Sequence, residues 1–269
     1  LARVEAAAGT GAWTEVSPAL YETLSLAQEM ARQSDGAFDV TSGTLTELWD
    51  AARAAQHPPT AEEIAAAQSR VDWHALELRE RAADDGEHPE VRLLRAGMKI
   101  DRGALIKGLA LDGIARSWAA GGAVNALADL GSSSILACGV NAEGEPWRIG
   151  VRNPRGESRS DLAATVQLSD AMLSASGDDE RYFLYEGRRY HHLVDPRTGD
   201  PAETGLASVT VILPQDAMTG TMWAGHEGQL SDMLSTAIFV MGAERGRSLL
   251  TDIPGAQLIL IGTDGRVIE

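Results

Sequence analysis

One stretch near the middle of the chain, Met98–Asp112, predicts a short apolar strand, a glycine turn and a helix in direct succession. The strand ends at Asp101, the turn contains Gly103, and Lys107 falls in the first turn of the helix. Free backbone N–H groups and the dipole at a helix start favour a bound anion such as phosphate. The spacing of a Walker A loop is absent, and an ordinary strand–turn–helix with a solvated lysine also fits these residues.

The elements expected along the rest of the chain mix hairpins with helices, which is typical of a single α+β domain. Ser17-Pro18 and the capping box Thr60–Glu63 each predict a helix start. Further helices are expected at 106–119 and 231–241. Paired strands are expected at 73–78 with 91–94, 163–168 with 171–175, 182–185 with 189–194, and 258–261 with 266–268. The link 82–89, with Asp85-Gly86, predicts an exposed hairpin loop.

Composition narrows the classes of partner. The chain of 269 residues has 39 acidic and 23 basic residues and a net charge of −16, so its surface repels nucleic acid and anionic membranes. The single cysteine, Cys138, excludes an internal disulfide. No run approaches the roughly 18 apolar residues of a membrane span, and no signal peptide is recognised. The chain starts at Leu1 without a methionine, so we expect that its native N-terminus was removed.

Two residues near the C-terminus form a candidate cation site. Asp232 and Thr236 are four positions apart on an expected helix and therefore share one face. A carboxylate and a hydroxyl suit Mg²⁺, which commonly keeps several waters and also binds substrate phosphate. The residues equally allow a structural role, with Asp232 in the first turn of the helix and Thr236 bonded to a backbone carbonyl.

Two adjacent histidines, His191 and His192, are candidates for a general base. They lie on an expected strand and therefore face opposite sides, so only one can enter a site. A histidine before the turn Asp195-Pro196 could accept a proton from a nucleophile, and a structural role fits as well. The sequence spacing of the remaining histidines matches no zinc motif.

Eight segments, taken together and in order, resemble the ApbE family of FAD:protein FMN transferases. They are Gly36–Asp39, Ile100–Asp112, Asn125–Gly131, Pro146–Gly150, Ser174–Asp178, Tyr190–Gly199, Ser208–Val211 and Ser231–Ala237. The segments His192–Gly199 and Asp232–Ala237 are the most specific. The resemblance covers residues 10 to 265 and implies one ApbE-like domain over 1–269 that lacks its N-terminal part.

The resemblance implies a reaction and a set of roles. Members of the family cleave the pyrophosphate of FAD with Mg²⁺, transfer FMN to a threonine of a target protein and release AMP. Ala37, Phe38, Asp39, Asp101 and Lys107 would contact FAD. The carbonyl of Ala104 and the side chains of Asp232 and Thr236 would hold Mg²⁺, and His192 would be the base. Asp232 thus also counts as catalytic. A Mg²⁺-dependent FAD pyrophosphatase and a non-catalytic flavin-binding protein are the alternatives.

Three departures from the family pattern accompany these expectations. The exported, often lipid-anchored N-terminus and its Met-Gly-Thr strand are missing, so any membrane link would pass through a lost anchor. By resemblance we expect an extracytoplasmic location, periplasmic or in the cell envelope. The Leu-Gly-Gly-Asp turn of the family reads Leu130–Ser134 here, without the second glycine and the aspartate. The segment 219–229 before Ser231 is extended.

Overall fold

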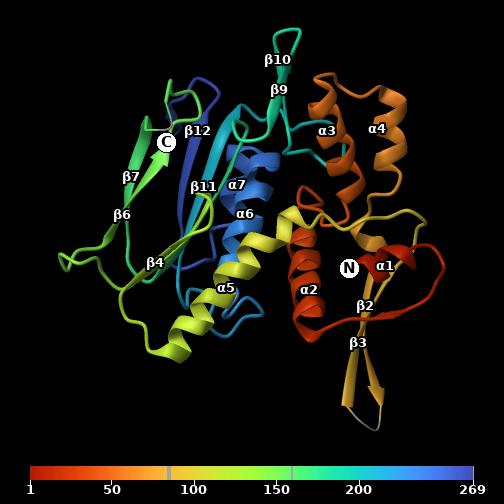
Figure 1. The fold of residues 1–269 in the computed structure, drawn as a ribbon, viewed down its shortest axis with the longest axis horizontal. Coiled ribbons are helices and arrows are strands. Elements are labelled where there is room, and N and C mark those ends of the chain that lie inside the picture. Colours follow the sequence, from red (N-terminus) through yellow and green to blue (C-terminus); the bar gives the residue numbers. More distant parts are fainter. Residues whose placement is uncertain (84–85, 159, 269) are drawn as a thin grey trace. The chain divides into compact units, whose positions relative to one another are not determined.

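The computed structural model describes residues 1–83, 86–158 and 160–268, without the side chains of residues 83 and 87. It contains helices and antiparallel strands in mixed order, which confirms the predicted α+β class (Figure 1). The chain forms two compact units, and each is built from two separate segments. Unit 1 comprises Leu1–Gly103 and Arg181–Pro201, and unit 2 comprises Ala104–Glu180 and the chain from Ala202 onward.

Unit 1 holds the N-terminal helices and two small sheets. Its helices are α1 (Ala2–Ala6), α2 (Pro18–Gln33), α3 (Gly43–Ala55), α4 (Ala61–Gln68) and a short 3-10 helix, Trp73–Ala75. One antiparallel sheet has the order β1 (Thr14–Glu15), β3 (Gly86–Leu93), β2 (Leu76–Ala83), and the other pairs β9 (Tyr182–Tyr185) with β10 (Arg188–His191).

Local capping explains where two helices of unit 1 begin. The hydroxyl of Ser17 accepts the N–H of Leu20 at 3.3 Å, and Pro18 occupies the first helical position of α2. Thr60 and Glu63 form the reciprocal capping box at the start of α4. Both predicted helix starts are confirmed.

Three predicted boundaries in unit 1 are wrong. β2 and β3 continue to Ala83 and from Gly86, so most of the expected loop 82–89 is strand, while Asp85 lies outside the described residues. The expected strand at Trp73 begins as a 3-10 helix. β10 ends at His191 instead of continuing to Val194, so His192 lies beyond the strand.

Unit 2 is built on a six-stranded antiparallel sheet. Its strand order is β13 (Val267–Ile268), β12 (Gln257–Gly262), β11 (Leu206–Pro214), β8 (Ala171–Gly177), β5 (Ser134–Cys138), β4 (Ala126–Asp129). A separate pair joins β6 (Trp147–Arg152) to β7 (Leu162–Leu168). The helices are α5 (Gly103–Gly121), of which all but the first residue belongs to unit 2, α6 (Glu227–Met241) and α7 (Ala243–Ser248).

The two faces of β8 serve different neighbours because side chains alternate along a strand. Leu173 packs with Ile135 and Ile212 under the β6–β7 pair. Met172 packs on the opposite side with Leu111 of α5 and Leu136 of β5. α6 packs against β8 and β11, and it lies beside β11 in Figure 1. Most of its residues are buried. The sheet therefore positions α5 and α6.

Several expectations for unit 2 need correction. The predicted hairpin of 163–168 with 171–175 is wrong, because β7 pairs with β6, and β8 pairs with β5 and β11. α5 begins at Gly103, so Lys107 lies in its second turn. α6 begins at Glu227, four residues early, so Asp232 lies in the second turn as well, and the proposed structural role for Asp232 in the first turn is excluded.

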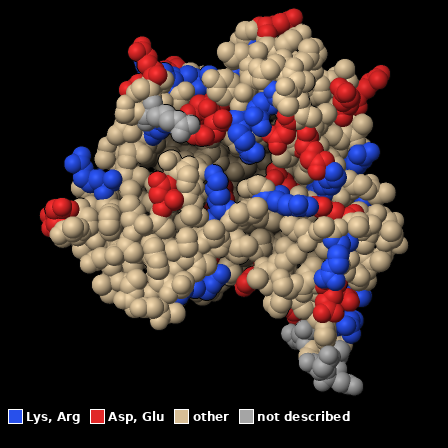
Figure 2. Space-filling model, in the orientation of Figure 1, with Lys and Arg blue, Asp and Glu red and all other residues tan. Residues whose placement is uncertain are grey.

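The described helices include none with the length and apolar character that crossing a membrane requires. On the face drawn in Figure 2, acidic and basic side chains are interspersed among uncharged ones.

Candidate active site

The candidate cation ligands of unit 2 come together where α5 and α6 meet. Oδ2 of Asp232 accepts the N–H of Gly108 at 3.1 Å. In an α-helix this N–H also faces the carbonyl of the residue four positions earlier, which is Ala104. Thr236 follows Asp232 by one turn of α6, and its hydroxyl lies 3.4 Å from the carbonyl of Asp232 and 3.1 Å from the hydroxyl of Ser176. The Thr236 hydroxyl thus makes the backbone contact that its structural alternative predicted. Metal binding by these residues stays a prediction.

The surroundings of Asp232 leave its negative charge incompletely compensated. The pKa of Asp232 is raised to about 6, mainly by burial. The Gly108 N–H and the Lys107 ammonium lower this pKa, and the nearby charge of Asp112 raises it. The residue is still partly exposed, so a cation can reach it. A carboxylate in such a position is well suited to bind a positive ion.

The chemistry of the donors favours a hard cation. Within the described residues no group of three His, Cys, Asp or Glu side chains could hold a metal ion. One carboxylate, one hydroxyl and one backbone carbonyl suit Mg²⁺, because this ion usually keeps waters and takes further oxygens from a phosphate. These residues therefore fit the implied metal.

Lys107 reaches the turn that departs from the family pattern. Its ammonium donates to the hydroxyl of Ser133 at 2.5 Å. Ser132 has a φ of 64°, a left-handed conformation that glycine adopts more easily. Ser132 therefore adopts a backbone conformation typical of glycine. In the same turn, Lys107 contacts the neutral hydroxyl of Ser133.

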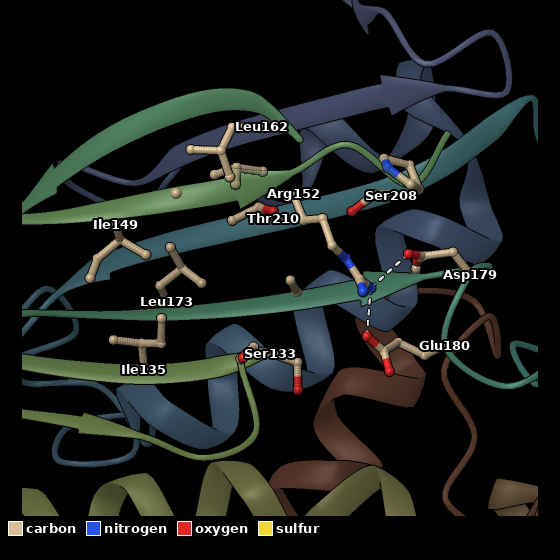
Figure 3. Close-up of a pocket in the computed structure, with 16 residues that line it drawn as sticks. Ser133, Ile135, Ile149, Arg152, Leu162, Leu173, Asp179, Glu180, Ser208 and Thr210 are labelled. Atoms are coloured by element: carbon tan, nitrogen blue, oxygen red, sulfur yellow. Dashed lines mark hydrogen bonds and ion pairs between the residues drawn. The ribbon is translucent and has the colours of Figure 1, made fainter. Parts of the chain in front are cut away.

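A cavity of about 210 Å³ opens beside this turn, within unit 2. Ser133 lies at its wall, and Figure 3 shows Ile135, Ile149, Leu162 and Leu173 around its apolar part. At its polar end Arg152 is held by Asp179 at 2.6 Å and Glu180 at 2.5 Å. The cavity lies on the face of β8 opposite to α6, so it is separate from Asp232.

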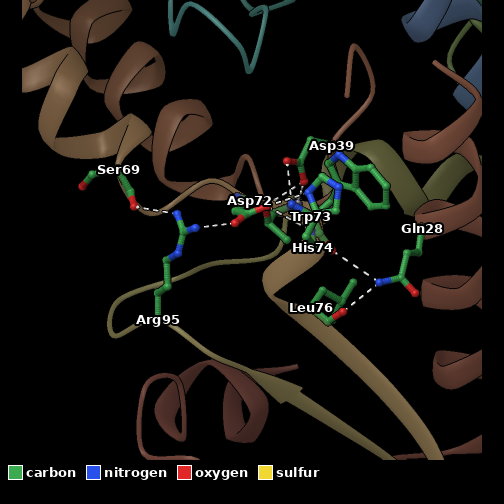
Figure 4. A network of polar contacts seen from close by, with 9 residues as sticks. Gln28, Asp39, Ser69, Asp72, Trp73, His74, Leu76 and Arg95 are labelled. Carbon is green, nitrogen blue, oxygen red and sulfur yellow. Dashed lines mark hydrogen bonds and ion pairs between the residues drawn. The ribbon is translucent and has the colours of Figure 1, made fainter. Parts of the chain in front are cut away.

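Asp39 of unit 1 is committed to an internal network. One of its carboxylate oxygens accepts the N–H and the hydroxyl of Thr41, both at 2.7 Å, and the other accepts the N–H of Trp73 at 3.0 Å (Figure 4). Burial raises its pKa. Ala37 and Phe38 are also buried. These contacts fix the loop around residue 39, and its contact with FAD stays a prediction.

Asp101 lies next to that loop within unit 1. Its N–H donates to the carbonyl of Val40 at 2.7 Å. Its carboxylate accepts the hydroxyl of Thr46 and the N–H of Gly103, both at 2.8 Å. The structure therefore places Asp101 beside the segment 37–40 and at the turn before α5, while its predicted contact with FAD stays untested.

The two histidines differ in their surroundings, also within unit 1. His191 is buried, with 7% of its surface exposed, and its Nδ1 accepts the N–H of Leu193 at 3.3 Å. His192 is partly exposed, and its backbone N–H donates to the carbonyl of Arg181 at 3.0 Å. The greater exposure of His192 agrees with its choice as the base, although its role stays a prediction.

Sequence reasoning gave no role to Gly108, Gly228 or Gln229, and none to Asp112, the last residue of the stretch Met98–Asp112. These residues form the contact between α5 and α6. The available signal was Gly108, because a glycine inside a predicted helix often has a packing reason. Gly228 lay outside the predicted helix 231–241 and gave no such signal.

Comparison with known proteins places this architecture in a family. The model of the ApbE family matches residues 1–260. The chain is 34% identical to the FAD:protein FMN transferase of Treponema pallidum, across 99% of this chain and 72% of that protein. It is 29% identical to the protein of the same name from Haemophilus influenzae, across 93% and 68%. The chain therefore belongs to the ApbE family.

Solved structures agree. The ApbE protein of Thermotoga maritima has a TM-score of 0.78 and 32% identity, covering 100% of this chain and 80% of that one. The flavinyl transferase ApbE of Pseudomonas stutzeri, in its apo form, has a TM-score of 0.75 and 28% identity, covering 98% and 75%.

Proposed function

We propose that this protein transfers the FMN moiety of FAD to a threonine hydroxyl of a target protein and releases AMP, with Mg²⁺ as cofactor. Membership of the ApbE family supports flavin transfer as the activity. The observation that carries the finer proposal is the position of the Asp232 carboxylate on Gly108, within one helical turn of Ala104, with Thr236 one turn further along α6.

In this proposal the residues of unit 2 bind the metal and the phosphates. The carbonyl of Ala104 and the side chains of Asp232 and Thr236 hold Mg²⁺, which, when bound, neutralises charge on the pyrophosphate. Lys107 adds a positive charge one turn beyond Ala104 on α5 and binds a phosphate oxygen. In a chain with a net charge of −16, these cations favour binding of an anionic dinucleotide.

The residues of unit 1 have separate proposed roles. Ala37, Phe38, Asp39 and Asp101 contact FAD, with Asp39 acting through the loop that its hydrogen bonds hold in place. His192 accepts the proton of the threonine hydroxyl while the hydroxyl oxygen forms a bond to the phosphorus of the FMN moiety. The bond from that phosphorus to the bridging oxygen breaks at the same time, and AMP leaves with that oxygen. Histidine suits the proton transfer because it titrates near neutral pH.

One experiment tests the proposal against its alternatives. The protein is incubated with FAD, Mg²⁺ and a candidate acceptor protein, with a threonine-to-valine acceptor as the control. Flavin fluorescence of the acceptor in a denaturing gel, together with AMP release, supports transfer. FMN and AMP without a fluorescent acceptor indicate a pyrophosphatase. FAD binding without AMP release indicates a flavin-binding protein.

An extracytoplasmic place of action is part of the same proposal and rests on the family resemblance. Fractionation of cells that produce the full-length protein tests it, and recovery in the cytoplasmic fraction would contradict it.

A further inference from the structure

Asp112 is a fully buried carboxylate on α5 that binds the start of α6. It accepts the N–H of Gly228 at 2.7 Å, the N–H of Gln229 at 3.3 Å and the side-chain amide of Gln229 at 3.0 Å. The first N–H groups of a helix have no partner inside the helix, and a negative charge there also complements the helix dipole. Asp112 thus supplies, from another helix, the cap that α6 lacks in its own sequence.

Two glycines allow the helices to approach this closely. A Cβ on Gly108 would lie 2.6 Å from Cα of Gln229, and a Cβ on Gly228 would lie 2.5 Å from Oδ1 of Asp112 and 2.8 Å from Cβ of Leu111. Any larger residue at either position would therefore push α5 and α6 apart.

The contacts of Asp112 and Asp232 are reciprocal. Asp112 follows Gly108 by one turn of α5, and Asp232 follows Gly228 by one turn of α6. The carboxylate on α5 accepts an N–H of α6, and the carboxylate on α6 accepts an N–H of α5. The two hydrogen bonds therefore form a double clamp, here defined as Gly108–Asp232 together with Asp112–Gly228.

We propose that Asp112 is a positioning residue that sets the register of α6 on α5 and so places Asp232 for metal binding. Each residue of slip along α6 would rotate Asp232 by about 100° away from Gly108. His226 extends the same network, because its Nδ1 lies 3.0 Å from the side-chain nitrogen of Gln229 and 3.8 Å from Oδ2 of Asp112. This inference rests on the proposed function, since Asp232, the residue that Asp112 positions, is a metal ligand in that proposal.

Electron paramagnetic resonance measures Mn²⁺ binding in the absence of FAD. It therefore tests the positioning role of Asp112 independently of catalysis. Asp112→Ala should weaken Mn²⁺ binding about tenfold or more. Gly228→Ala should weaken Mn²⁺ binding to a similar extent, although this variant keeps the carboxylates of both Asp112 and Asp232. The matched control is Gly113→Ala, next to Asp112 on α5, where an added Cβ meets no atom within 4 Å. This variant should bind Mn²⁺ like the unmodified protein.

The outcomes separate this inference from the proposed function. Unchanged Mn²⁺ affinity in a folded Asp112→Ala protein overturns the positioning role. If that variant does not fold, the result for Gly228→Ala decides, and unchanged affinity there overturns the role as well. If Asp232→Ala itself leaves Mn²⁺ binding intact, the proposed metal site is wrong, and the positioning role is refuted with it.

Discussion

The carboxylate of Asp232 accepts the backbone N–H of Gly108 at 3.1 Å, although 124 positions separate the two residues in the chain. This contact lies at the second turn of both α5 and α6. The contact brings the incompletely compensated carboxylate of Asp232 within one helical turn of the carbonyl of Ala104. The predictions for metal and phosphate binding are based on this contact.

Replacing Asp232 by alanine should abolish Mg²⁺-dependent AMP release and leave the fold intact. AMP release should stop because the cation loses the only carboxylate among its proposed ligands. The fold should persist because the removed charge was partly buried. AMP release is measured over a range of Mg²⁺ concentrations, with the exposed Asp252→Ala as a control for loss of an acidic residue. Normal release by Asp232→Ala at limiting Mg²⁺ would remove Asp232 from the site.

Replacing Lys107 by methionine should weaken FAD binding by about 1–3 kcal/mol, the usual contribution of a charge-assisted contact. Calorimetric titration with FAD measures the change. The control is Arg116→Met, which removes an exposed positive charge from the same helix. Equal losses in both variants would indicate a general effect of net charge instead of a contact made by Lys107.

Replacing His192 by alanine should slow transfer to the acceptor about 10²-fold or more, because a threonine hydroxyl needs a positioned base. FAD binding should persist. Replacing His191 should affect transfer much less, although its burial predicts a lower melting temperature. Transfer rates are compared at saturating FAD and acceptor. Loss of transfer only in folded His191→Ala would reverse the assignment of the two histidines.

The pH dependence of stability should change in Asp112→Asn. Burial raises the pKa of Asp112 to about 6 from an ordinary value of 3.8. Between these values the folded protein holds a proton that the unfolded chain has lost, so stability falls as pH rises through this window and is lowest above about pH 6. Asparagine does not titrate, so across this pH window the stability of the variant relative to the unmodified protein should rise by roughly 3 kcal/mol, at about 1.36 kcal/mol per unit of pKa difference.

Urea unfolding without divalent cations at several pH values from 4 to 7 measures this difference. His226 is the charged group that acts on Asp112, and Lys107 and Asp112 are those that act on Asp232. His226, Lys107 and Asp232 all remain in the variant. Parallel stability curves for the two proteins would show that Asp112 does not take up a proton on folding.

The features that the sequence predicted are those with local causes. The capping box at Thr60 and the proline start of α2 need only neighbouring residues, and both are confirmed. The partner of β7 was mispredicted because the pattern of one strand does not show whether it pairs with the strand before it or the strand after it. β7 pairs with the preceding β6, while β8 pairs with the more distant β5 and β11. The true start of α6 at Glu227 was missed for a related reason. A segment with glycines at 225 and 228 resembles a loop, and the carboxylate that caps it lies 116 positions earlier.

The candidate site divides in the same way. Asp232 and Thr236 were found because helical spacing places them on one face, and Lys107 because it follows a glycine turn. The second carboxylate, Asp112, received no role, since its function depends on a helix crossing that spacing within one helix does not reveal. The strand end at His191 was also beyond sequence reasoning, because the alternating pattern continues past it.

The return of the chain to unit 1 at Arg181–Pro201 affects the order in which the protein can fold during synthesis. The indole of Trp49 donates to the carbonyl of Gly199, 150 positions later, and Gln68 binds the carbonyls of Pro196 and Arg197. The ribosome must therefore complete the first segment of unit 2, Ala104–Glu180, before the first hundred residues find these partners. Until then the aromatic cluster around Trp49 lacks Phe183, which leaves apolar surface for a chaperone to bind.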